Sequence, residues 1–317
     1  MTHNRFQNKV AGSVFTLPVC VVIAAALWWL PQQDSSIPNI LGLALCLLTT
    51  YVMMETNAQQ HIIRIRTRMM SSVWLILAAS LSFMHPLAKP IIAANFLCIG
   101  YHLFFRCDQE DEPQIYVFHT FLMLSLGSFC APIMLLMAVP FFLYLTIFLR
   151  SLTNKVFWAG VLGLIVPFWC YASWCFITKD MQSFVTRIVD MAQFEQPSLE
   201  AIVSLPFVWQ VSAAFIALLS IVSILHYLRT NYDDKIRVRM IQYIYITQTL
   251  MLMAFLVLQP AHYQTTMALF VASASPLIAH YFALTSSFLS NLFFILSLLF
   301  TAAMAVLNLW MPSFSIS

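Results

Sequence analysis

The placement of basic residues between long apolar segments most constrains the fold of this chain. Apolar runs alternate with short polar gaps, and twelve of the fifteen Lys and Arg residues fall in every second gap, leaving three for the other gaps. Loops on the cytoplasmic side of a membrane carry an excess of Lys and Arg. The asymmetry therefore predicts a chain that crosses a membrane many times in one fixed orientation.

The composition agrees with a bilayer as the solvent. Hydrophobic residues make up 61% of the chain and charged residues only 9%, whereas soluble domains carry about a quarter charged residues. So few charges could not cover a soluble protein of 317 residues. We expect the lipid bilayer as a partner and no nucleic acid, because the net charge of +3 reflects orientation in the membrane.

Segment length predicts the number of crossings. A helix needs about 20 apolar residues to cross the hydrocarbon core, and about 17 is the lower limit. This rule predicts an all-α polytopic bundle of about eleven spans, forming one transmembrane domain over residues 1–317. The expected spans are 10–30, 37–54, 69–86, 89–105, 115–131, 133–149, 156–177, 206–228, 240–258, 265–283 and 288–310.

The same gaps predict the orientation, with the N-terminus inside and the C-terminus outside a bacterial inner membrane. The inside gaps then hold Arg5, Lys9, Arg64, Arg66, Arg68, Arg106, Arg150, Lys155, Arg229, Lys235, Arg237 and Arg239. The outside gaps hold Lys89, Lys179 and Arg187. Residues 115–149 must form a hairpin that turns near 127–132, because one helix of that length would extend about 52 Å, well beyond the hydrocarbon core.

The long polar gap at 178–205 is predicted to be an external loop that contains an amphipathic helix. Apolar residues recur in it at helical spacing, namely Met181, Phe184, Val185, Ile188, Val189 and Ala192. Such a helix suits the outer membrane surface. A lid packed over the bundle is an equal alternative.

Polar residues inside apolar spans are the candidates for a binding site, because they are costly there. Asn95, His102 and His280 are the candidates within the spans, and Lys89 and Arg187 are the candidates on the outer side. The alternative role for Asn95 is a hydrogen bond between helices, and the alternative for the two histidines is to reach the membrane interface near a helix end. The histidines are scattered without metal-ligand spacing, so we expect neither a metal nor another cofactor.

Two further patterns bear on function. The acidic run of Asp108, Glu110, Asp111 and Glu112 suits either a solvated loop or a site for a divalent cation with a phosphate-bearing substrate. Only six glycines occur in the chain, so few helices should cross closely, apart from the helix that carries Gly160 and Gly163. Since transporters generally use Gly and Pro to break their helices, this scarcity disfavours a transporter.

Several stretches resemble a family of multi-spanning inner-membrane proteins of Bacteroidota whose function is uncharacterised. These stretches are Phe148–Leu152, Gly163–Phe168, Phe176–Asp180, Lys235–Arg239 and Ser275–Phe282. The resemblance covers most of the chain from about residue 55. It implies a membrane protein of the cell envelope and assigns no activity.

The chain also resembles, more loosely, membrane glycosyltransferases and polymerases that use lipid-linked sugars. The likeness lies in the cytoplasmic N-terminus, the short hairpins and the outer amphipathic helix. In those enzymes a carboxylate in the first external loop takes a proton from the acceptor or holds a metal. That loop contains one carboxylate here, Asp34, where those enzymes usually have an acidic pair.

Three classes of function therefore remain, and they leave open whether the chain is an enzyme. The first is an envelope protein without catalysis, whose partners are other envelope proteins. The second is a glycosyltransferase-like enzyme on a lipid-linked substrate, which predicts an outer cavity lined by Asp34 with Lys89 or Arg187. The third is a small-solute transporter, which predicts a central polar cavity reached by Asn95, His102 and His280.

Overall fold

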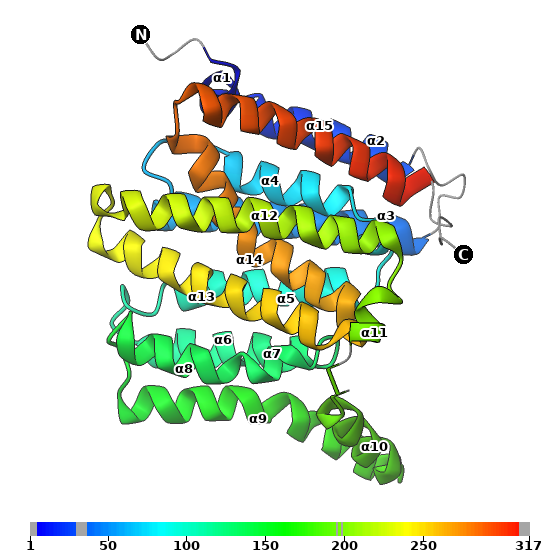
Figure 1. The fold of residues 1–317 in the computed structure, drawn as a ribbon. Helices are drawn as coiled ribbons and strands as arrows, with labels where there is room; N and C mark the ends of the chain where they lie inside the picture. Colours follow the sequence, from blue (N-terminus) through cyan, green and yellow to red (C-terminus); the bar gives the residue numbers. More distant parts are fainter. Residues whose placement is uncertain (1–4, 30–36, 195, 198, 311–317) are drawn as a thin grey trace.

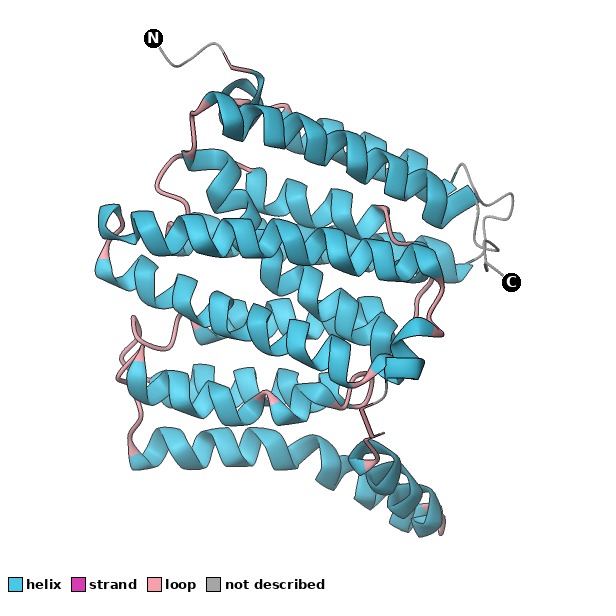
Figure 2. Ribbon diagram, viewed as in Figure 1, coloured by secondary structure: helices cyan, strands magenta, loops and turns pink. Residues whose placement is uncertain are grey.

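The computed structural model describes residues 5–29, 37–194, 196–197 and 199–310. Helices joined by short loops make up this part of the chain, and the described residues form no strand (Figure 2). This agrees with the expected all-α class. Inside a membrane, helices satisfy every backbone hydrogen bond within their own segment.

The helices follow one another in a simple order. They are α1 (Phe6–Gly12), α2 (Thr16–Trp29), α3 (Ile37–Gln60), α4 (Met69–Ala79), α5 (Lys89–Phe104), α6 (Pro113–Ser128), α7 (Ile133–Leu136), α8 (Ala138–Ile147), α9 (Asn154–Ile177), α10 (Met181–Ala192), α11 (Leu199–Val203), α12 (Phe207–Thr230), α13 (Ile236–Leu258), α14 (Tyr263–Leu284) and α15 (Phe288–Trp310). Short 3₁₀ turns occur at Ser82–Met84 (η1), Asn231–Asp233 (η2) and Pro260–His262 (η3).

Most of the helices lie side by side and span the molecule from one end to the other (Figure 1). Helices α2 and α15 form one edge, α9 forms the opposite edge, and α10 leaves the bundle beyond α9 (Figure 1). Among the described residues, six helices are long and apolar enough to cross a membrane, or seven if α1 and α2 count as one bent span. The chain therefore has the helices of an integral membrane protein.

Each of the eleven segments predicted to span contains a helix, but several of these helices are short. Helix α2 has 14 residues, α4 has 11, and α5 and α6 have 16 each. The segment predicted at 10–30 is not one helix, since α1 and α2 meet at an angle of 96°. The Thr16 hydroxyl donates to the Val10 carbonyl across this bend at 2.5 Å, and the Ser13 amide donates to the same oxygen at 3.3 Å.

The chain turns between α6 and α7, as the length of residues 115–149 requires. Helix α6 ends at Ser128 and α7 begins at Ile133. The Ala131 amide donates to the Gly127 carbonyl at 2.9 Å and closes the turn. The prediction that this stretch is not one long helix is confirmed.

Helix α14 lies at the centre of the bundle, and α4, α5, α12 and α13 pack against it. Small side chains fill much of its surface, namely Ala268, Ala272, Ser273, Ala274, Ser275 and Ala279, and all of them are buried. We expected close packing mainly at Gly160 and Gly163. A Cβ at Gly163 would lie 2.4 Å from the Phe118 carbonyl oxygen of α6, so that close contact exists. The expectation overlooked α14, where Ala and Ser allow the approach instead of Gly.

The turn before α5 is held tightly against α2 and α3. The His85 ring is buried and stacks on Trp28 with centroids 4.0 Å apart. Nε2 of the same ring lies 2.9 Å from the Ala79 carbonyl oxygen, so stacking and a polar contact both hold His85 in place. Gly42 of α3 packs against the backbone of this turn, since a Cβ there would be 1.9 Å from the His85 carbonyl oxygen.

Replacing Gly42 tests how tightly this turn is packed. Gly42→Ala should lower the free energy of unfolding by about 1–3 kcal/mol, because the added methyl group displaces the 85–86 backbone. Gly12→Ala is the matched control, since a Cβ there meets no atom within 4 Å. Thermal unfolding in detergent measures both. Equal unfolding temperatures for the two variants would contradict the close packing.

Candidate functional site

A polar cavity of about 640 Å³ opens at one end of the bundle. The loops that carry Arg64, Arg106, Arg150 and Lys235 leave the helices at the opposite end, on the left in Figure 1. The cavity lies among α5, α10, α14 and the α6–α7 turn, and the residues that line it include Lys89, Arg187, Asp190 and His262. The cavity is therefore at the end of the bundle where few Lys and Arg residues lie.

Lys89 and Arg187 reach this cavity from helices far apart in the sequence. Lys89 is the first residue of α5, after the turn at His85. Arg187 lies on α10, whose N-terminus is capped by the Asp180 carboxylate through the Ser183 amide at 3.3 Å. Two of the three cations predicted for the outer side thus line one cavity. The helix predicted within 178–205 is present, and it carries one of them.

Arg187 fixes the position of α10 against the bundle. Its guanidinium donates to the Phe129 carbonyl in the α6–α7 turn. An arginine has five N–H donors, so this bond leaves others available to a ligand. The side chain is half-buried, while Lys89 is exposed.

Cys130 lies in the α6–α7 turn and lines the cavity together with Lys89 and Arg187. The two cations therefore share one cavity with the turn to which Arg187 is bonded.

Backbone groups add to the positive potential. Helices α5 and α14 both begin at this cavity, and the first turn of α14 lines it with Tyr263, Gln264 and Thr265. The free N–H groups of a helix N-terminus favour anions. The Tyr263 ring stacks on Trp209 at 5.1 Å, and its hydroxyl donates to the Trp209 carbonyl at 2.6 Å, so this side of the wall is rigid.

Asp190 is the carboxylate among the described residues that line the cavity. The sequence analysis named neither Asp190 nor His262 as a site candidate, because nothing in the local sequence marks either residue as part of a site. Asp34, the candidate catalytic carboxylate, lies outside the described residues.

Asn95 and His102 do not share a cavity with these residues but join α5 to α3. The Asn95 amide donates to the Thr49 hydroxyl at 3.0 Å, and Nδ1 of His102 lies 3.0 Å from the Thr56 hydroxyl. The two pairs are seven residues apart on both helices, so they repeat along one interface. Both side chains therefore make hydrogen-bond contacts between helices, the alternative role considered for Asn95.

His280 forms a third polar pair, at the opposite end of the bundle from the cavity. Its Nε2 lies 3.0 Å from Oδ2 of Asp234, and the two side chains are only 3% and 2% exposed. Arg64 approaches the other oxygen of Asp234 at 3.7 Å. Asp234 was missed from the sequence, because an acid in a short loop beside Lys235 has the pattern of a solvated residue.

Removing the Asp234 carboxylate should destabilise the bundle. Asp234→Ala leaves His280 buried without its partner, so we expect a loss of about 3 kcal/mol in the free energy of unfolding. Asp233→Ala is the matched control, since its side chain is 43% exposed in its pair with Arg64 and exposed pairs contribute about 0–1 kcal/mol. Thermal unfolding in detergent compares them. Equal losses of unfolding free energy in the two variants would show that the buried pair stabilises the bundle no more than the exposed pair does.

The acidic run before α6 is engaged with arginines. Asp108 accepts two hydrogen bonds from Arg237, both at 2.9 Å, and Glu110 pairs with Arg106 at 3.0 Å. Among the described residues, no three His, Cys, Asp or Glu side chains gather closely enough to hold a metal ion. These contacts tie the α5–α6 loop to the start of α13.

Comparison with protein-family models, curated proteins and solved structures finds no match for this chain. The functional conclusion therefore depends on the geometry of the cavity and on the distribution of charge.

Proposed function

We propose that this chain is a multi-pass protein of a bacterial inner membrane that binds a phosphate-type anion at its outer face. The observation that carries the proposal is the convergence of Lys89 and Arg187 on one cavity. Eleven spans with the N-terminus inside and the C-terminus outside complete the topology, and the 12:3 division of cations supports that orientation.

The chemistry of the cavity favours phosphate over a neutral ligand. Arg binds phosphate oxygens through its fork of donors, and Lys acts as a point charge. Helices α5 and α14 also begin at the cavity, so the positive ends of their helix dipoles favour an anion there. At about 640 Å³ the cavity accommodates a headgroup larger than a single phosphate.

The contacts of the polar residues within the spans do not favour the transporter alternative. That alternative predicts a central polar cavity reached by Asn95, His102 and His280, whereas each of them is held by a partner in a different helix or loop. Glycosyl transfer on a lipid-linked substrate remains the second candidate. It needs a carboxylate that takes a proton from the acceptor, and Asp190 is in the cavity to do so.

Anion titration tests the proposal directly. The protein is placed in nanodiscs of phosphatidylcholine and titrated with inorganic pyrophosphate in a calorimeter. The double variant Lys89→Gln, Arg187→Gln should bind about tenfold or more weakly, because a hydrogen bond to a charged group contributes about 1.5–3 kcal/mol.

Lys179→Gln is the matched control. Lys179 is the third cation predicted for the outer side, but it does not line the cavity. Its removal should leave pyrophosphate affinity unchanged. If wild-type protein fails to bind pyrophosphate, or if the Lys179 variant loses as much affinity as the double variant, the cavity is not an anion site.

A further inference from the structure

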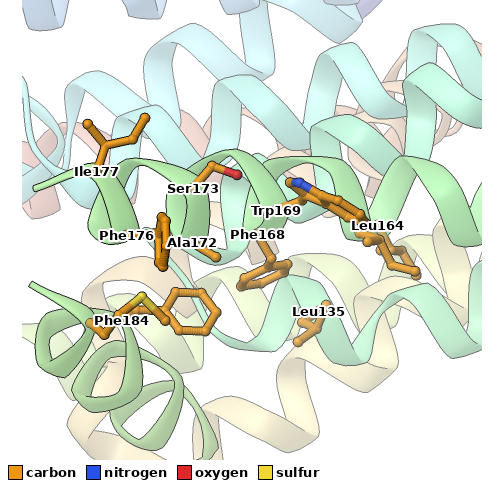
Figure 3. Close-up of a pocket in the computed structure, with 11 residues that line it drawn as sticks. Leu135, Leu164, Phe168, Trp169, Ala172, Ser173, Phe176, Ile177 and Phe184 are labelled. Atoms are coloured by element: carbon orange, nitrogen blue, oxygen red, sulfur yellow. The ribbon is translucent and has the colours of Figure 1, made fainter. Parts of the chain in front are cut away.

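An apolar groove of about 760 Å³ lies along α9 and is bounded by α7 and α10. Figure 3 shows Phe168, Ala172 and Phe176 of α9 beside Phe184 of α10 and Leu135 of α7. Its lining extends from Leu164 to Ile177 along α9, which corresponds to about 20 Å of helix. The groove is long and nearly free of polar groups, as a binding surface for a hydrocarbon chain must be.

The groove and the basic cavity lie on two sides of one wall. Phe129 lines the cavity, and its ring packs on Phe168 of the groove with centroids 5.0 Å apart. Tyr171 continues the wall from Phe129 at 5.7 Å to Phe184 at 5.8 Å. Along α10, Phe184 lines the groove and Arg187, three residues later, lines the cavity. One helix thus presents an apolar contact and a cation side by side.

We infer that the ligand is an anionic phospholipid of the outer leaflet, one whose phosphate headgroup has a net negative charge, with its headgroup in the cavity and its chain in the groove. The inference rests on the proposed function, since the cavity supplies the charge that selects an anionic lipid. Charge complementarity with the phosphate and the shared wall are what distinguish this groove from ordinary lipid-facing surface. Helix α10 would contact both parts of the lipid, because its Phe184 lines the groove and its Arg187 lines the cavity.

Tryptophan fluorescence can report occupation of the groove. Trp169 lines the groove and is 70% exposed, and bromine atoms on an acyl chain quench tryptophan on contact. The protein is placed in phosphatidylcholine nanodiscs that contain a small fraction of either brominated phosphatidic acid or brominated phosphatidylcholine. The difference between wild type and Trp169→Phe isolates the signal of Trp169.

We expect the brominated phosphatidic acid to quench Trp169 more than brominated phosphatidylcholine at the same fraction, with a local enrichment of about fivefold for each cation engaged. The excess quenching by brominated phosphatidic acid should vanish in the double variant Lys89→Gln, Arg187→Gln. It should also vanish in Ala172→Phe, whose added ring fills the groove. Trp174 is also exposed on α9 but lies outside the groove. The Trp174-dependent signal, isolated with Trp174→Phe, should be equal for the two lipids.

Equal quenching of Trp169 by the two lipids would overturn the inference. The pyrophosphate titration separates this failure from that of the proposed function. If pyrophosphate binds and depends on Lys89 and Arg187, the cavity is an anion site whose ligand has no chain in the groove. If Ala172→Phe weakens pyrophosphate binding as well, the groove variant disturbs the cavity, and Leu135→Phe on the opposite wall replaces it in the lipid experiment.

Discussion

The backbone of this protein must satisfy its hydrogen bonds without water, and the rest of the structure depends on that constraint. An apolar solvent leaves helices as the segments that can cross it, and the described loops that join the long helices lie at the two ends of the bundle (Figure 1). Charged side chains gather at these ends as well. Most of the Lys and Arg residues therefore lie at one end of the bundle, and Lys89 and Arg187 lie at the other.

Within the bundle, several polar side chains join helices. Asn95 with Thr49 and His102 with Thr56 connect α3 to α5, and Tyr101 with Ser273 connects α5 to α14 at 2.9 Å. The residues of these pairs do not line the basic cavity. They therefore support the architecture, whereas Lys89 and Arg187 line the cavity.

The sequence predicted the helices and the turn at 127–132 because apolar length and loop charge are local signals. It also named Lys89 and Arg187, since both are cations in gaps that have few. It did not predict that α14 is central or that His280 pairs with Asp234, because both depend on contacts between residues 46 or more positions apart. The bend between α1 and α2 was missed for another reason: Gly12, Ser13 and Pro18 lie close to it, but the segment 10–30 is apolar on average and hydropathy does not register the break. The eleven spans and the orientation stay predictions.

The central claim is that the basic cavity opens on the outer side of the membrane. Cysteine labelling in spheroplasts with a membrane-impermeant maleimide tests it most directly, in a background where Cys130 and Cys170 are replaced by Ser. Gln264→Cys places a thiol in the cavity, and Asp233→Cys places one at the opposite end of the bundle. The account predicts that Gln264→Cys is labelled in intact spheroplasts and Asp233→Cys only after lysis. Labelling in the reverse order would contradict it.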